Sequence, residues 1–246
     1  MTEPTVLLVF VAAMITALAT GLGALPLLAS RAAGGRWLGV GNAVAAGLML
    51  AACYSLIVEG FEFDALRTLA GVVAGVGLIM LAHRWLGRHN GMSIANVQGA
   101  DAAKVLLIVG IMTAHSAAEG IGVGVAYGGG RELGDFITIA IALHNVPEGL
   151  AIALIMVPRG ATVSKAALWS IFSSLPQPLL AVPAFLFVLV FTPWLPVGLG
   201  LAAGAMLWMI FSELLPEASA ELPNASLGAM VVLAFAAMMG ATLLIG

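Results

Sequence analysis

Long apolar runs, separated by short stretches rich in Gly, Pro or charged residues, occupy most of the 246-residue chain. Each run is close to the roughly 20 residues that a helix needs to cross the hydrocarbon core of a bilayer. The runs lie at residues 5–28, 37–58, 65–86, 102–127, 134–157, 163–191, 195–215 and 225–246. The pattern therefore predicts an all-α integral membrane protein with eight transmembrane helices, organised as a single domain over residues 1–246.

Prolines lie in the middle of two of these runs. The sixth run contains Pro176, Pro178 and Pro183, and because proline has no amide hydrogen to donate within a helix, we expect this span to be kinked or broken. Pro147 removes the bond to the carbonyl of Leu143 in the fifth run. Broken helices recur at transporter binding sites, although an ordinary proline kink relieved by packing explains Pro147 equally well.

Composition agrees with a membrane protein and narrows its chemistry. Hydrophobic residues make up 62% and charged residues 9% of the chain, and the mean hydropathy is +1.12, far from the balance of a soluble domain. The single cysteine, Cys53, excludes an internal disulfide and a cluster of thiolate ligands. A bound metal would therefore need imidazole, carboxylate or amide ligands.

The nine Lys and Arg residues are distributed unevenly between the two sides of the predicted bundle. Only Arg67 and Arg131 lie on one side. The residues on the opposite side are Arg31, Arg36, Arg84, Arg88, Lys104, Arg159 and Lys165. Because short basic connections stay in the cytoplasm, the odd-numbered connections are expected inside and both termini outside.

Two histidine–glutamate pairs lie within the apolar runs: His115 with Glu119, and His144 with Glu148. In each pair the residues are four apart, so both side chains lie on one face of a helix and can approach one ion. An ionised Asp, Lys or Arg at the centre of a transmembrane helix costs about 2.5–3.5 kcal/mol, and a divalent cation would offset a similar cost for the glutamates. Protonation of the glutamates, or hydrogen bonds to the histidines between packed helices, would also offset it.

The two segments that carry these pairs align without a gap, HSAAEGIGV with HNVPEGLAI. The corresponding positions are His115 and His144, Ser116 and Asn145, Glu119 and Glu148, and Gly120 and Gly149. On neighbouring helices this shared pattern supplies two nitrogen and two oxygen donors, a set suited to tetrahedral zinc or a similar ion. The duplication favours a metal site over two unrelated buried pairs.

These segments resemble the ZIP (Zrt/Irt-like) metal transporters, and more closely their bacterial, GufA-like branch. HSAAEGIGVG is similar to the family's fourth-span motif and HNVPEGLAIAL to its fifth, and further similarity is found in GLMLAACYSLIVEGFE, SSLPQPLLA and AAGAMLWMIFSELLPEA. The resemblance implies an eight-span fold with both termini outside, a homodimer, and a metal centre halfway across the membrane between the fourth and fifth spans.

In this family the metal centre often holds two ions that share the glutamates. Carried over by position, the first ion would be bound by His115, Glu119, His144 and Glu148. The second would be bound by Ser116, Glu119, Asn145, Glu148 and Gln177. This chain departs from the family pattern, since Ser116 stands where many members have Asn and Gln177 where Glu is common. Neutral oxygen donors bind a hard dication more weakly than carboxylates do, so we expect one strong position and a weak or empty second one.

Three further glutamates are candidates for the entrance or exit of an ion path. Glu59 and Glu62, with Asp64, form an acidic cluster at the outer end of the second run, where they would attract cations, although a solvated loop is the simpler explanation. Glu213 falls at the cytoplasmic end of the seventh run. The family resemblance implies a role in ion exit there, whereas periodicity alone implies a helix end in water.

Together these features predict uptake of a divalent metal ion across a bacterial cytoplasmic (inner) membrane by alternating access at the His/Glu centre, with zinc as the first choice and iron, manganese or cadmium as alternatives. The expected partners are the metal ion, lipid and a second copy of the chain, with no nucleic acid and no prosthetic group. No GxxxxGK[ST] loop is present, so ATP is not the direct energy source. An enzyme is not expected, because the HExxH arrangement is absent and because all four predicted ligands would bind the ion, which leaves no open position for a catalytic water. The alternative is a membrane metal-binding receptor that does not transport and whose second metal position has degenerated.

Overall fold

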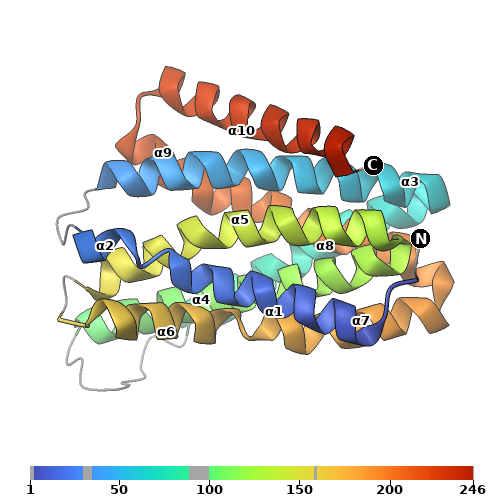
Figure 1. The fold of residues 1–246 in the computed structure, drawn as a ribbon, viewed down its shortest axis with the longest axis horizontal. Helices are drawn as coiled ribbons and strands as arrows, with labels where there is room; N and C mark the ends of the chain where they lie inside the picture. Colours follow the sequence, from blue (N-terminus) through green and yellow to red (C-terminus); the bar gives the residue numbers. More distant parts are fainter. Residues whose placement is uncertain (1–2, 30–34, 89–99, 158–159, 246) are drawn as a thin grey trace.

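The computed structural model describes residues 3–29, 35–88, 100–157 and 160–245, and within these ranges the regular structure is entirely helical. The helices lie side by side in an elongated bundle, with both chain ends at the same end of it (Figure 1). They are α1 (Val6–Leu22), α2 (Pro26–Ala29), α3 (Gly35–Arg88), α4 (Ala100–Gly129), α5 (Arg131–Met156), α6 (Val163–Ser174), α7 (Pro176–Val190), α8 (Leu195–Met209), α9 (Leu215–Glu221) and α10 (Asn224–Ile245). The 3₁₀ turn η1 (Thr192–Trp194) precedes α8, and the π-helical turn η2 (Ile210–Leu214) joins α8 to α9.

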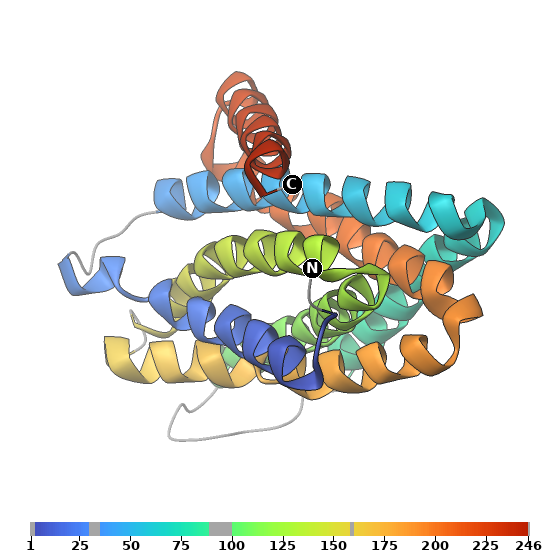
Figure 2. The same ribbon diagram turned by 45° about the vertical axis from the view of Figure 1, so that its right-hand side comes forward.

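Helix α3 is a hairpin of two long arms that reverses at Asp64 (Figure 2). Asp64 has an extended backbone (φ −166°, ψ 107°) that interrupts the helical path. Its carboxylate accepts the backbone N–H of Arg67 at 3.0 Å, which caps the second arm. The hydroxyl of Thr68 donates to the carbonyl of Asp64 at 2.8 Å. The predicted runs at 37–58 and 65–86 therefore fold as the two arms of one hairpin.

The prolines of the sixth and fifth runs have different effects on their helices. The expected break in the sixth run is confirmed, because α6 ends at Ser174 and α7 begins at Pro176, with Leu175 between them. A proline in the first turn of α7 is tolerated since that position has no helical acceptor for an amide hydrogen. Helix α5, in contrast, continues through Pro147.

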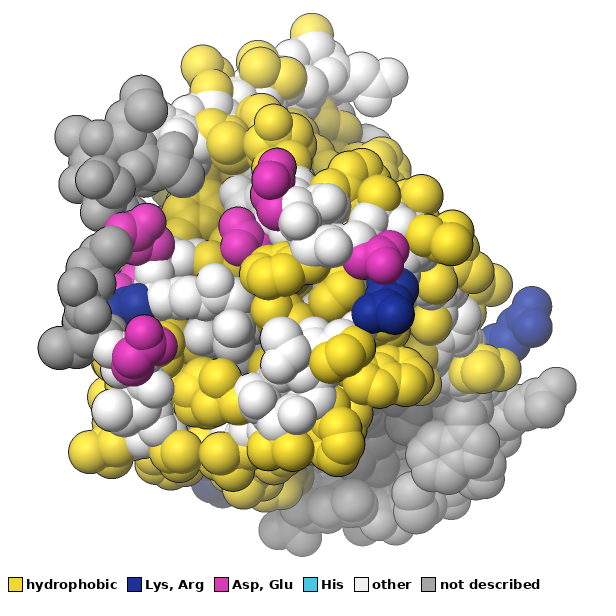
Figure 3. All heavy atoms as spheres, turned by 90° about the vertical axis from the view of Figure 1, so that its right-hand side faces the viewer, with side chains coloured by type: hydrophobic (Ala, Val, Ile, Leu, Met, Phe, Trp, Pro, Cys, Tyr) yellow, Lys and Arg dark blue, Asp and Glu magenta, His cyan; other side chains and the backbone are white. Residues whose placement is uncertain are grey.

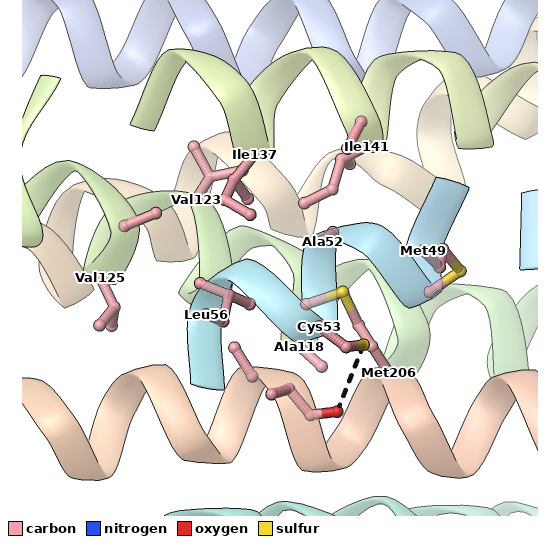
Figure 4. Close-up of a cluster of buried hydrophobic side chains, with 14 of the residues drawn as sticks. Met49, Ala52, Cys53, Leu56, Ala118, Val123, Val125, Ile137, Ile141 and Met206 are labelled. Atoms are coloured by element: carbon pink, nitrogen blue, oxygen red, sulfur yellow. Dashed lines mark hydrogen bonds between the residues drawn. The ribbon is translucent and has the colours of Figure 1, made fainter. Parts of the chain in front are cut away.

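The centre of the bundle is an apolar cluster contributed by α3, α4, α5 and α8 (Figure 4). Met49, Val123, Ile137 and Met206 are at most 1% exposed within it. The thiol of Cys53 is also buried and donates to the carbonyl of Ala203 at 3.7 Å. Cys53 is therefore a packing residue between α3 and α8 in this structure.

The outer surface of the bundle is apolar as well. Leu66 is 78% exposed, Val73 73% and Leu7 71%, which is costly in water and favourable against lipid. By length and composition, five stretches of the described chain can cross a membrane: Val6–Leu28, Arg36–Ala82, Arg131–Met156, Val163–Val190 and Thr192–Glu221. The stretch Arg36–Ala82 contains most of both arms of the α3 hairpin. The protein is thus an all-helical integral membrane protein.

Candidate metal centre

The two sequence motifs meet because α4 and α5 form a helical hairpin around Gly130. Gly130 has φ 140°, a conformation that L side chains rarely adopt, and it joins the helices directly. His115 lies 15 residues before this glycine and His144 lies 14 residues after it. Because a helix rises about 1.5 Å per residue, the two motifs come to the same depth in the bundle.

Three of the predicted ligands form a compact buried group: Glu119 of α4, and His144 and Glu148 of α5. One ligand atom from each residue lies within 4.8 Å of the others. Nε2 of His144 is 3.2 Å from Oε1 of Glu119. His144 and Glu148 share one face of α5 because they are four residues apart. The arrangement brings one nitrogen and two carboxylate donors together in the interior.

The donor atoms of this group are poorly satisfied by the protein itself. Both carboxylate oxygens of Glu148 and both ring nitrogens of His144 are buried without a hydrogen-bond partner. A buried carboxylate that accepts no hydrogen bond is unstable unless a cation or a proton compensates it. Imidazole nitrogen and carboxylate oxygen are ligands of zinc and related dications. The chemistry of the group therefore fits a divalent metal ion.

His115 lies beside a different carboxylate. Its Nδ1 is 3.8 Å from Oε2 of Glu213, and the two side chains are 4% and 17% exposed. Glu213 belongs to the π-helical turn η2, and the helical path continues from there through α9 to Glu221. The expectation of a helix end at Glu213 is therefore wrong. Pro216 does not end the helix: it directly follows the π-helical turn η2, and the helical path continues to Glu221.

The predicted neutral ligands Asn145 and Gln177 are hydrogen-bonded to each other, and Gln177 is also hydrogen-bonded to Glu119. The side-chain nitrogen of Gln177 donates to Oε2 of Glu119 at 2.7 Å. The amide of Asn145 donates to Oε1 of Gln177 at 3.1 Å. It also donates to the backbone carbonyl of Thr16 at 2.7 Å. These residues thus form a polar network, the amide network, that joins α1, α4, α5 and α7.

Ser116 contacts a different set of hydroxyl groups. Its Oγ is 3.5 Å from Oγ of Ser174 at the end of α6, and Ser174 is 2.8 Å from the hydroxyl of Thr20 on α1. Ser116, Thr20 and Ser174 are all fully buried. The aligned positions Ser116 and Asn145 therefore face different neighbours, although both lie next to a motif histidine.

Sequence reasoning missed the contribution of α1 to these networks. Thr16 and Thr20 lie four residues apart on one buried face of α1, Thr16 in the amide network and Thr20 against Ser174. A signal was present, because hydroxyl residues at helical spacing within an apolar run usually face other helices rather than lipid. The partners of these hydroxyls are more than 100 residues away in sequence, so only the packed structure identifies them.

Two motif glycines allow the neighbouring helices to approach the centre. A Cβ atom at Gly120 would lie 2.5 Å from the carbonyl oxygen of Gln177. A Cβ atom at Gly149 would collide with the carbonyl oxygen of Thr20. Both positions therefore require glycine for close packing, one between α4 and α7 and the other between α5 and α1.

Acidic side chains gather at the end of the bundle where α3 reverses and α4 passes into α5. Figure 3 shows them among apolar side chains on this face, with fewer basic ones. The sequence-predicted Glu59 is partly buried and Glu62 is exposed there. Asp64 instead pairs with Arg67, at 3.5 Å, within the hairpin turn. Of the predicted acidic cluster, Asp64 thus shapes the turn, whereas Glu59 and Glu62 lie at this end of the bundle without a part in the turn.

Comparison with known proteins gives a consistent result. A family model described as ZIP zinc transporter matches residues 88–246. A candidate zinc transporter of Arabidopsis thaliana is 44% identical over 225 residues, covering 90% of this chain and 36% of its own length. This chain thus spans about a third of that plant protein.

Two bacterial proteins are similar over most of their length. The zinc transporter GufA of Myxococcus xanthus is 34% identical over 225 residues, which cover 84% of this chain and 87% of GufA. The zinc transporter ZIPB of Bordetella bronchiseptica is 34% identical over 219 residues, covering 81% of this chain and 69% of ZIPB. The region that the family model matches, residues 88–246, includes both His/Glu motifs and the broken α6–α7 helix.

Proposed function

Since this chain belongs to the ZIP zinc transporter family, we propose that it carries a divalent metal ion across a membrane into the cytoplasm. Zinc is the proposed substrate, because zinc is named for the similar proteins and because imidazole and carboxylate donors suit it. Iron, manganese and cadmium are secondary candidates, since sites of this kind discriminate weakly among such ions. The protein acts as a transporter rather than as an enzyme.

The ion binds at Glu119, His144 and Glu148. The main support for this assignment is the carboxylate of Glu148, which is buried without a hydrogen-bond partner. Both oxygens of Glu148 are buried beside His144 and Glu119, so a dication there would stabilise charge that the protein leaves uncompensated. His115 lies on the same face of α4 as Glu119, next to Glu213. It completes the ligand set or receives the ion as it moves toward Glu213.

The proposed topology has eight crossings and both termini outside. Four crossings are α1, α4, α5 and the broken helix α6–α7; the two arms of α3, the α8–α9 helix and α10 supply the other four. Both chain ends lie at the same end of the bundle (Figure 1), as an even number of crossings requires. Arg67, beside the α3 reversal, and Arg131, at the start of α5, lie at that end. Arg36, at the start of α3, and Lys165, at the start of α6, lie at the other end of the bundle. The positive-inside rule then places the chain ends outside.

Transport proceeds by alternating access, with the ion reaching the centre from the acidic end and leaving toward Glu213. In this mechanism α1, α4, α5, α6 and α7 move as one unit against α3, α8, α9 and α10. The hydroxyl and amide contacts of Thr16 and Thr20 link α1 to the helices of the first unit, which supports their moving together. Glu59 and Glu62 attract cations at the entrance. The protein functions as a homodimer in a bacterial inner membrane.

Zinc uptake into proteoliposomes tests this function directly. We expect the purified protein to accumulate Zn²⁺ in vesicles without ATP, and Glu148→Gln to abolish uptake because it removes the unpartnered carboxylate. Glu221→Gln, an exposed carboxylate at the end of α9, is the matched control and should transport normally. Saturable zinc binding without accumulation would instead identify a metal receptor, and absence of both would refute the proposed site.

A further inference from the structure

Helix α6 has an inner face that is occupied by hydroxyl groups. Ala166, Ser170, Ser173 and Ser174 are all fully buried there. The hydroxyl of Ser170 donates to the carbonyl of Ala166 at 3.0 Å, and that of Ser173 to the carbonyl of Ser170 at 2.8 Å. Ala166, Ser170 and Ser173 recur at intervals of four and three, so they lie on one side of the helix. The opposite side of α6 therefore faces away from the bundle.

That outer side carries Lys165, Leu168, Trp169 and Phe172, which recur at the same helical spacing. Leu168 is 66% exposed and Phe172 59%, and Trp169 is partly exposed. Helix α6 lies at the edge of the bundle in both ribbon views (Figures 1 and 2). In a membrane these side chains contact lipid, because the outer surface of a spanning bundle has no other neighbour.

The outer side of α6 is hollowed. An open groove of about 350 Å³ lies along it, and the described residues that line this groove are Leu168, Trp169 and Phe172. This volume is at the lower end of the range typical of ligand sites. The rings of Trp169 and Phe172 meet edge to face, with centroids 5.5 Å apart and an interplanar angle of 79°, an arrangement that aromatic pairs favour. The groove thus has a defined apolar wall that fits a hydrocarbon chain.

The depth of the groove indicates what kind of hydrocarbon it accepts. Helix α6 has 12 residues, so it is about 18 Å long, whereas the hydrocarbon core of a bilayer is about 30 Å thick. Leu168 and Phe172 both lie within α6, which ends at the break before Pro176. The groove therefore occupies about one leaflet. An acyl chain of that leaflet matches this depth, whereas a spanning helix of a partner would need a longer contact surface.

A cation stands at the end of the groove. Lys165 is exposed and lies three residues before Leu168 and four before Trp169, on the same side of α6. Among the residues that the structure describes, no carboxylate forms an ion pair with it. A lysine at such a position lays its aliphatic stem along apolar surface and keeps its ammonium group among the lipid headgroups. The end of the bundle that carries Lys165 is the proposed cytoplasmic end, and the cytoplasmic leaflet is rich in anionic lipids.

We propose that α6 binds one anionic phospholipid. The headgroup binds the ammonium group of Lys165, and one acyl chain lies in the groove formed by Leu168, Trp169 and Phe172. Charge and shape select this ligand together, because a zwitterionic headgroup brings a second cation close to Lys165. The site faces the membrane on the side of α6 opposite to the hydroxyl face, away from the proposed metal ligands.

Native mass spectrometry of the full-length protein, released from detergent with its bound lipids, tests the headgroup contact. The probe is an equimolar mixture of phosphatidylglycerol, which is anionic, and phosphatidylcholine, which is zwitterionic, with identical acyl chains. We expect the wild type to retain about fivefold more phosphatidylglycerol, since one basic residue near anionic lipid contributes about this factor. Lys165→Gln should abolish the preference and Lys165→Arg should keep it. Arg36→Gln removes an exposed cation at the same end of the bundle and should leave the preference unchanged.

A second pair of variants tests the groove with the same measurement. Leu168→Trp fills the groove with a larger side chain, so we expect it to retain one phospholipid fewer per chain than the wild type. Leu179→Trp is the matched control, because Leu179 is 67% exposed on α7 and is not among the described residues that line the groove. It should retain as much lipid as the wild type. Both changes are on the lipid-facing surface and should leave the fold intact.

Equal retention of the two lipids by the wild type, a preference that persists in Lys165→Gln, or an equal loss of preference in Arg36→Gln would overturn the headgroup contact. Unchanged retention by Leu168→Trp would overturn the groove as the site of the acyl chain. A wild-type dimer that only Leu168→Trp separates into single chains would show that a second copy, rather than a lipid, covers the groove. None of these outcomes depends on zinc uptake, so the failure of this inference and the failure of the proposed function are distinguishable.

Discussion

The motifs on α4 and α5 have matching sequences and different surroundings. His144 on α5 lies 3.2 Å from Glu119, whereas its counterpart His115 on α4 lies 3.8 Å from Glu213 of η2. Asn145 joins the amide network, whereas its counterpart Ser116 contacts Ser174. The i, i+4 spacing places the histidine and glutamate of each motif on one face, but the helices packed against that face determine what each side chain contacts.

The glutamates and glycines of the two motifs behave more alike. Glu119 and Glu148 are both buried in the same group, and Gly120 and Gly149 both permit close approach of a neighbouring helix. The two motifs thus share the glutamates of the metal group and the glycines at the close helix contacts. The contacts differ at the histidine and at the polar residue that follows it. His144 lies beside Glu119 of α4 and His115 beside Glu213 of η2. Asn145 contacts α1 and α7, whereas Ser116 contacts α6. The two halves of the site should therefore respond differently to mutation.

Loss of Glu148 should have the largest effect. Glu148→Gln keeps the shape of the side chain and removes the carboxylate whose oxygens lack a hydrogen-bond partner. We expect zinc affinity to fall by more than the roughly 10–100-fold that the loss of an outer-shell partner costs, with the fold retained. Chelator-competed titration with Zn²⁺, alongside circular dichroism, measures both properties. Retention of wild-type affinity would remove Glu148 from the ligand set.

The two histidines should contribute differently to zinc affinity. His144→Ala removes a nitrogen from the compact group and is expected to reduce zinc affinity by about 100-fold, whereas His115→Ala should reduce it by about tenfold, in the range of an outer-shell contact. The same titration compares the two variants. Equal losses would mean that the motifs contribute equally once the metal is bound, and would break the proposed asymmetry.

Substitution of a motif glycine should lower the thermal stability of the fold. Gly149→Ala places a methyl group against the backbone of Thr20, and overpacking of this kind costs about 1–3 kcal/mol. Gly77→Ala in α3 is the matched control, because a Cβ atom there meets nothing within 4 Å. Thermal unfolding in detergent should show a lower Tm for Gly149→Ala and little change for Gly77→Ala. Similar behaviour of both variants would contradict the close approach of α1 and α5.

Removal of the partner of His115 should have the smallest effect on binding. Glu213→Gln keeps the shape of the side chain and removes the carboxylate that lies 3.8 Å from Nδ1 of His115. Because Glu213 lies outside the compact group, we expect zinc affinity to change by less than about fivefold, which corresponds to about 1 kcal/mol. Zinc uptake should slow more than binding weakens, since Glu213 lies on the proposed exit path rather than in the compact group. A large loss of equilibrium affinity would place Glu213 among the ligands.

Much of the architecture could be predicted from the sequence. The apolar runs correspond to helical stretches, and the prolines of the sixth run correctly indicated the break at Leu175. The end of the seventh run was misplaced because Glu213 and Pro216 resemble a helix terminus, whereas a π-helical turn carries the helix on to Glu221. Local composition does not show such a turn, since it depends on how the surrounding helices pack.

The sequence by itself determined that the chain is a helical membrane protein and that each motif presents its histidine and glutamate on one helical face, because hydropathy and helical periodicity are local properties. Only the tertiary structure decided that Glu119 meets His144, that His115 meets Glu213, and that Thr16 contacts Gln177 across 161 residues of sequence. Those contacts depend on the rotation and depth of helices distant in sequence. Such rotations are fixed by packing throughout the bundle, notably the close approaches at Gly120 and Gly149.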